Sequence, residues 1–221
     1  MRVNRVVIPD VACHLTQKGN YGQTTFFDRD DREYYLARFT QAAQEYSLDL
    51  LGWCLMTNHV HWIVVPRTTT SMADTIRRAH AEYALYLNRK QGRISGHLWQ
   101  ARFYSCVLAG THFWRALRYV ELNPVRAGLV EVADEYLYSS AAVHTGRQSA
   151  PSWLNLEIWR QEYNTVEWRQ FLTLRPEEDW VGIRHATRTG RLWGEPCHAR
   201  VGRPKLTIYQ DKPETRNTTS D

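Results

Sequence analysis

The chain has 221 residues, enough for one compact domain with an appendage and hardly enough for two full domains. Its composition, 43% hydrophobic and 23% charged, is typical of a globular protein, and its net charge of +5 suits a polyanionic partner. The longest apolar stretch, residues 50–56, is far too short to span a membrane, and the N-terminus has no signal-peptide pattern. The four cysteines include no CxxC pair, which argues against a zinc ribbon. We therefore expect a soluble cytoplasmic protein.

The sequence predicts alternating strands and helices over the first 123 residues. Apolar runs bounded by turn residues indicate strands, and apolar residues at helical spacing indicate helices. In chain order the predicted elements are a strand at 11–18, a helix at 30–46, strands at 48–56 and 59–65 around a tight turn, a helix at 71–88 with Ser71 as N-cap, a strand at 102–108, and a helix at 111–123 with Thr111 as cap.

The order of the first six elements, β-α-β-β-α-β, is that of the ferredoxin-like split βαβ arrangement. It predicts an α+β fold, in which an antiparallel sheet has helices on one face. We expect a first domain at 1–138 and a helical C-terminal extension at 139–202, with a Trp-rich helix at 153–174. The polar segment 203–221 contains few apolar residues, so we expect it to be disordered.

Two histidines, His59 and His61, directly follow the predicted hairpin turn. Residues i and i+2 of a strand point to the same face, so both imidazoles can reach one metal ion. Imidazole is the commonest metal ligand in proteins, and two imidazoles leave coordination positions open for substrate oxygens. The alternative is a pair of surface histidines beside a turn.

The predicted helix at 111–123 has an apolar stripe, with Arg115, Tyr119 and Asn123 spaced four residues apart on another face. We therefore expect Tyr119 on the polar face, one turn before a side-chain amide. A phenol in this position is a candidate nucleophile toward phosphorus, and a divalent ion would offset the developing charge. The alternative is an amphipathic tyrosine at the edge of a helix.

Basic residues gather in the sequence between the second predicted helix and the fourth strand, with aromatic residues among them. Arginine next to aromatic rings suits phosphate neutralisation and base stacking, whereas the alternative is a solvated charged face. The basic residues are Arg77, Arg78, Arg89, Lys90, Arg93 and Arg102.

Three stretches of the sequence resemble a known family. They are LLGWCLMTNHVHWIVVP (50–66), GHLWQARFYSCVL (96–108) and ALRYVELNPVRAGLV (116–130), and they resemble the REP-associated tyrosine transposases, which are single-tyrosine HUH transposases. The resemblance extends over about residues 5–145 and implies a ferredoxin-like sheet, in agreement with the predicted element order.

The resemblance also implies roles for individual residues. His59 and His61 match the metal ligands, Tyr119 matches the nucleophile, and Asn123 stands where relatives supply a third ligand. Because phosphate oxygens and an amide form a hard ligand set, we expect Mg²⁺ or Mn²⁺. The implied partner is single-stranded or hairpin DNA, bound by a monomer or a homodimer. We expect the six basic residues above, together with Arg115 and Arg126, to contact that DNA.

The expected activity is that of a transposase, a metal-dependent endonuclease and strand transferase for single-stranded DNA. Attack by Tyr119 gives a 5′-phosphotyrosine and a free 3′-OH, and the implied substrate is a hairpin-forming palindromic repeat. One alternative is a nucleic-acid-binding member of this family that has lost catalysis, motivated by the short segment after RHATRTGR (184–191). Another is a metal-binding structural or regulatory protein unrelated to DNA.

Overall fold

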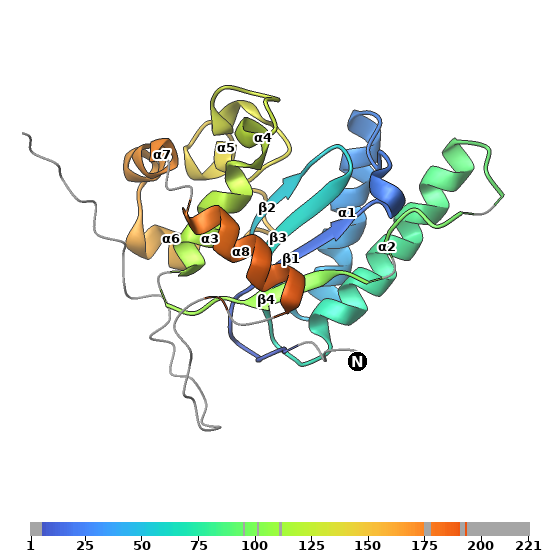
Figure 1. Cartoon of the computed structure of the whole chain (residues 1–221), viewed down its shortest axis with the longest axis horizontal. Coiled ribbons are helices and arrows are strands. Elements are labelled where there is room, and N and C mark those ends of the chain that lie inside the picture. The colour runs from blue at the N-terminus through green and yellow to red at the C-terminus, as the bar shows by residue number, and fades with distance from the viewer. Residues whose placement is uncertain are drawn as a thin grey trace, which may run out of the picture.

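The computed structural model describes residues 6–94, 96–100, 102–110, 112–174, 178–190 and 193 (Figure 1). Within these residues, four antiparallel strands form one sheet in the order β2-β3-β1-β4. The connecting helices follow the predicted order, so the ferredoxin-like βαββαβ fold is confirmed. The elements are β1 (Cys13–Lys18), α1 (Arg29–Glu45), β2 (Leu48–Leu55), β3 (His59–Pro66), α2 (Ser71–Lys90) and β4 (Tyr104–Val107).

Both faces of the sheet are covered by helices, because the central strands have apolar side chains on both sides. In β3, Val60 and Trp62 pack into the core shared with α1 and α2. Ile63 and Val65 point the other way, into a core shared with α3 (His112–Glu121) and α8 (Glu178–Thr189). Figure 1 shows α3 and α8 lying across the sheet on one side. The sequence predicted helices on one face of the sheet, and α1 and α2 cover that face. The opposite face is also covered, by α3 and α8, which form a second layer of helices.

The start of α2 differs from the prediction. Thr70 is the N-cap, and Ser71, predicted as the cap, is the first helical residue. The Ser71 hydroxyl accepts a hydrogen bond from the amide of Thr68, at 3.0 Å. The prediction was wrong because this hydroxyl bonds to the chain before the helix, so it caps no helical amide.

The Trp-rich segment predicted as one helix at 153–174 forms two helices, α6 (Glu157–Glu162) and α7 (Thr165–Thr173). The single-helix prediction was wrong because Asn164 and Glu167 form a capping box, which begins a new helix.

The predicted helix at 111–123 ends earlier than expected, since α3 ends at Glu121 and a short helix α4 (Asn123–Arg126) follows. Pro124 lies in the first turn of α4, where its missing N–H costs no hydrogen bond.

Two predictions fall on residues outside the described part of the chain, namely the cap at Thr111 and the disordered segment 203–221. The remaining helices are α5 (Ala141–His144) and two 3₁₀ turns, Asn20–Gly22 and Ala133–Glu135. Among the described residues, no helix is long and apolar enough to cross a membrane.

A buried carboxylate joins α3 to the helices that follow it. Glu121 is fully buried, and it accepts hydrogen bonds from the Ser140 hydroxyl, from Nδ1 of His144 and from Nε1 of Trp168. Ser140 and His144 lie at α5 and Trp168 lies in α7. One side chain therefore anchors two helices of the C-terminal extension to the second core.

We expect Glu121→Ala to lower the free energy of unfolding by about 3–5 kcal/mol, because it leaves buried donors without an acceptor. Urea unfolding followed by circular dichroism measures this change. The matched control is Glu157→Ala, on an exposed position of α6, which should change the free energy by less than about 0.5 kcal/mol. Similar effects of the two substitutions would show that the Glu121 network contributes little to stability.

A second buried polar group, His80, lies on α2. Its Nε2 is 3.0 Å from the Tyr35 hydroxyl, and its ring stacks on Trp99 with the centroids 4.3 Å apart. Burial lowers the pKa of His80 from its ordinary 6.5 to about 3. His80 is therefore neutral in the folded chain over the whole range in which an exposed histidine becomes charged.

Stability should consequently decrease as the pH falls below 6.5. The unfolded chain takes up a proton at His80 near pH 6.5 and the folded chain only near pH 3, so acid favours the unfolded state. Between these two pKa values, protonation of His80 in the unfolded chain lowers the free energy of unfolding by up to about 1.4 kcal/mol for each pH unit of acidification. In His80→Gln, the slope of unfolding free energy against pH between 6 and 4 should be smaller by roughly this amount. An unchanged slope would contradict the assignment.

Candidate active site

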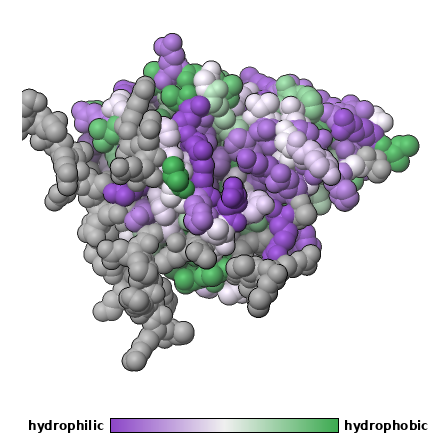
Figure 2. All heavy atoms as spheres, in the orientation of Figure 1, coloured by the Kyte–Doolittle hydropathy of each residue, from purple (hydrophilic) through white to green (hydrophobic). Residues whose placement is uncertain are grey.

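A cavity of about 720 Å³ lies between the sheet and the second helix layer. It is formed where β1, β3 and β4 face α3, α4 and α8, and it combines imidazole, phenol, amide and cationic groups. On the face drawn in Figure 2, hydrophilic side chains gather over the middle of the molecule, around α8. The polar residues that line the cavity are His14, Thr16, Lys18, His59, His61, Gln100, Tyr104, Tyr119, Asn123, Arg126, Arg184, His185, Thr187 and Arg188.

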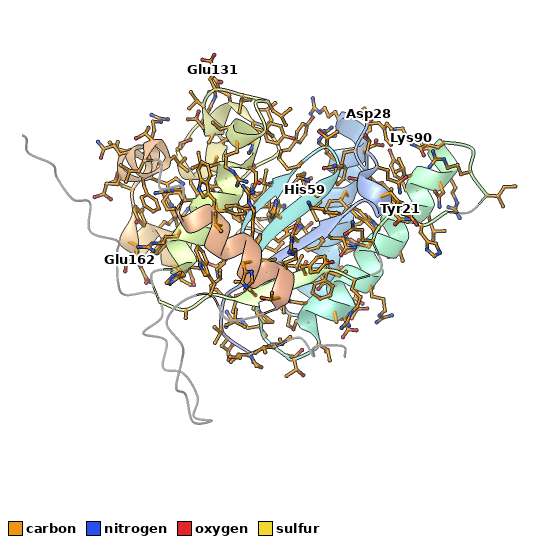
Figure 3. All side chains as sticks on the ribbon, in the orientation of Figure 1. Tyr21, Asp28, His59, Lys90, Glu131 and Glu162 are labelled. Carbon is orange, nitrogen blue, oxygen red and sulfur yellow. The ribbon has the colours of Figure 1, made fainter. Side chains whose placement is uncertain are left out.

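The alternation of β3 places His59 and His61 on the same side of the sheet, in a cavity also lined by α8, with ring centroids 4.9 Å apart. Figure 3 labels His59 at the sheet. The Nδ1 of His59 lies 2.7 Å from Oδ1 of Asn58, whose amide nitrogen donates to the carbonyl of Gly22. Because a carbonyl oxygen only accepts, His59 must hold its proton on Nδ1. Its Nε2 therefore keeps a free lone pair, as a metal ligand requires.

Both histidines are neutral at pH 7. Burial, together with smaller effects of the positive charges of Lys18 and Arg126, lowers the pKa of His59 to about 4. Burial also holds the pKa of His61 well below its usual value, with smaller effects of the neighbouring histidines and cations. Neutral imidazoles bind metal ions without first losing a proton, so the electrostatics of the cavity suit a metal site.

Tyr119 lies against these histidines and is only 5% exposed. Its ring meets His61 and His14 edge to face, with centroids 5.8 and 5.9 Å apart. The guanidinium of Arg126 lies 4.5 Å from the centre of the Tyr119 ring and 4.8 Å from that of Trp180 in α8. Tyr119 shares this polar cavity with Asn123, and residues of α8 also line it, so the ring is nearly buried although it lies on the polar face of α3.

Asn123 presents its oxygen to the same cavity. Its Nδ2 donates hydrogen bonds to the carbonyl oxygens of Tyr119 and Val120, at 2.9 and 3.2 Å. Because a carbonyl oxygen only accepts, these bonds fix the orientation of the Asn123 amide. The other amide atom, Oδ1, accepts a hydrogen bond from the guanidinium of Arg126 at 3.5 Å, and both residues line the cavity. Among the described residues, no three His, Cys, Asp or Glu side chains are grouped to hold a metal ion. A metal site here would therefore combine two imidazoles with an amide oxygen.

A family model described as "Transposase IS200 like" matches residues 8–123, more than half of the chain. The chain belongs to the IS200-like transposase family. It is 26% identical over 117 residues to a Haemophilus influenzae protein named as a REP-associated tyrosine transposase. That match covers 48% of this chain and 66% of the relative, so the chain spans slightly less than two thirds of the relative's length.

The fold of this family member is similar to that of a REP-associated tyrosine transposase solved bound to a REP hairpin. The TM-score is 0.56 at 15% identity, and the match covers 70% of this chain and 91% of the other. The resemblance that the three sequence stretches indicated is thus confirmed, and so is the fold that it implied.

Of the eight basic residues predicted to contact DNA, Arg126 lines this cavity. Arg77 and Arg102 line a separate groove next to Trp99, and Lys90 pairs with Asp28 at a distance from His59 (Figure 3). Contact of these residues with DNA stays a prediction. The seven that do not line the cavity are Arg77, Arg78, Arg89, Lys90, Arg93, Arg102 and Arg115.

Sequence reasoning missed several residues of the cavity. Arg184 and Arg188 reach it from α8, and Lys18 and His14 reach it from β1. Arg184 and Arg188 are four residues apart within RHATRTGR, so a helical reading of that stretch would have placed both on one face. His14 and Lys18 are even-numbered residues of β1, like Thr16, and only the sheet register shows that they share a face with His61.

Tyr104 is a second tyrosine of the cavity. It lies on β4 and is 40% exposed, whereas Tyr119 is nearly buried. Among the described residues, Tyr119 is the tyrosine whose ring packs against His61, with the centroids 5.8 Å apart. The geometry therefore favours Tyr119 as the phenol next to a metal site and leaves Tyr104 as its competitor.

Proposed function

We propose that this transposase is a metal-dependent endonuclease and strand transferase for single-stranded DNA, with Tyr119 as its nucleophile. The observation that supports the proposal is the convergence of His59, His61, Tyr119 and Asn123 on one cavity. These side chains come from β3, α3 and α4, and Arg126 brings a cation to the Tyr119 ring. This arrangement suits attack of a phenol on a phosphodiester.

In the proposed reaction, the Tyr119 hydroxyl attacks phosphorus, and the bond from phosphorus to the 3′ oxygen breaks. The DNA 5′ end stays on the tyrosine, the 3′ oxygen leaves with a proton as a hydroxyl, and the phenol proton passes to solvent. His59, His61 and Asn123 would hold Mg²⁺ or Mn²⁺, which would supply polarisation of the phosphoryl oxygens. Arg126 stabilises the negative charge that develops on the phenol oxygen. Attack of a second 3′-OH on the adduct then joins two strands.

The proposed substrate is a hairpin formed by a palindromic repeat in single-stranded DNA. Its support is the similarity to a solved relative bound to a REP hairpin, together with the cationic side chains of the cavity. Lys18, Arg126, Arg184 and Arg188 can neutralise phosphates around the nucleophile.

Incubation of the full chain with hairpin-bearing single strands and Mg²⁺ tests the proposal on a denaturing gel. We expect a covalent protein–DNA band that disappears with a chelator, and binding that weakens as salt rises. A perfect duplex of the same sequence at the same salt should bind more weakly. Binding without any covalent band would instead indicate a family member that has lost catalysis, and absence of binding would exclude a role on DNA.

A further inference from the structure

A chain of hydrogen bonds runs from His61 through His14 to Thr187 in α8, along the wall of the cavity. The Nδ1 of His61 lies 2.9 Å from Nε2 of His14, and Nδ1 of His14 lies 2.8 Å from the Thr187 hydroxyl. The Thr187 oxygen is in turn 3.3 Å from the sulfur of Cys106. His14 and Thr187 are both almost fully buried, 2% and 3% exposed. The proposed reaction gives none of these three supporting side chains a role.

Each ring nitrogen of a neutral histidine is either a donor or an acceptor, so this chain has two possible directions. In the outward direction, His61 donates from Nδ1 to His14, and His14 donates from Nδ1 to Thr187. The Nε2 of His61 then has a free lone pair. In the inward direction Thr187 donates to His14 and His14 donates to His61, which leaves a hydrogen on Nε2 of His61. Only the outward direction makes His61 a metal ligand through Nε2.

The charges around the cavity favour the outward direction. Lys18 and Arg126 line the cavity that His61 also lines, and both are cationic. A lone pair on Nε2 interacts favourably with these positive charges, whereas an N–H bond there would be repelled. His59 holds its proton on Nδ1 through Asn58, so both histidines of β3 would present the same nitrogen to the cavity.

We propose that His14, held by Thr187, is a positioning residue that fixes His61 in its Nδ1–H form. This role rests on the proposed function, in which His61 is a metal ligand. A partner of this kind orients the ligand ring and sets which nitrogen carries the proton, and its loss typically costs about 10–100-fold in metal affinity.

The role of Thr187 connects the C-terminal extension to the metal site. Thr187 lies in α8, which also brings Arg184 and Arg188 to the cavity. One helix thus supplies both cationic side chains for DNA and the end of the hydrogen-bond chain behind His61. The extension is therefore a component of the catalytic centre in this proposal.

Two pairs of variants of the full chain test the role. Thr187→Val removes the hydroxyl at nearly constant volume, and Thr187→Ser keeps it. His14→Phe removes the acceptor for His61, and His14→Gln offers a side-chain oxygen in its place. Nitrogen-15 NMR of the histidine rings, without metal, reports which nitrogen of His61 is protonated. Titration with Mn²⁺ gives the dissociation constant, and circular dichroism verifies that each variant is folded.

In the wild type we expect His61 protonated on Nδ1. In Thr187→Val and His14→Phe this form should lose population, and the Mn²⁺ dissociation constant should rise about 10–100-fold for His14→Phe. Thr187→Ser should match the wild type, and His14→Gln should recover most of the affinity. A wild-type His61 protonated on Nε2, or unchanged Mn²⁺ affinity and protonation in both folded deletion variants, would overturn the role.

The proposed function fails by a different result, which is the absence of a covalent DNA adduct with the wild-type chain. The NMR comparison needs neither DNA nor metal, so it decides the role of His14 whichever way the cleavage assay turns out.

Discussion

Replacing Tyr119 with Phe is expected to abolish the covalent DNA adduct, lowering cleavage by at least about a thousandfold. The substitution removes the only atom that would bond to phosphorus, and loss of a nucleophile leaves just the contributions of binding and charge stabilisation. The edge-to-face contacts of the ring with His14 and His61 and its contact with Arg126 do not need the hydroxyl. The variant should therefore still bind hairpin DNA with nearly wild-type affinity.

Stability should also be nearly unchanged in Tyr119→Phe. Within the described residues, the Tyr119 hydroxyl has no hydrogen-bond partner, so its removal leaves no buried group unpaired. A thermal unfolding midpoint close to that of the wild type would verify this. Lost cleavage can then be assigned to chemistry rather than to folding.

The matched control is Tyr104→Phe, because Tyr104 lines the same cavity and is more accessible. We expect this variant to form the adduct at close to the wild-type rate. Peptide mapping of the trapped wild-type adduct should place the DNA on residue 119. An adduct on Tyr104, or undiminished cleavage by Tyr119→Phe, would exclude Tyr119 as the nucleophile.

The sequence was sufficient to predict the sheet and its first two helices, because these elements have strong local signals. The strands around Thr57 and Asn58 are mostly apolar and are separated by a short polar turn, and the helices of this unit have apolar residues at helical spacing. The i, i+2 spacing of His59 and His61 needed only the strand period to place both on one face.

The surroundings of Tyr119 could not be predicted in the same way, because they depend on a contact between distant parts of the chain. The pattern of α3 leaves Tyr119 on a polar face, yet α8, some sixty residues later, covers that face and leaves it 5% exposed. A pattern within one helix does not show which later helix packs against it. His14 shows the same limit, since its bond to His61 joins residues 47 positions apart.

Replacing His59 and His61 together with Ala is expected to abolish both Mn²⁺ binding and cleavage. The two imidazoles are the cavity's neutral nitrogen donors on β3, and an amide oxygen alone holds a divalent ion weakly. Cleavage should fall by at least about a thousandfold, because the charge that develops at phosphorus would lose several kcal/mol of stabilisation.

A second readout separates metal binding from chemistry. Wild-type protein in Mn²⁺ at one hundred times its dissociation constant should gain about 2.7 kcal/mol in unfolding free energy, and the double variant should gain none. His97→Ala is the matched control, because His97 is exposed and does not line the cavity. It should keep both the Mn²⁺-dependent stabilisation and the cleavage. If the double variant still cleaves at the wild-type rate, the metal does not lie at these histidines, and Tyr119 must be activated by cations such as Arg126.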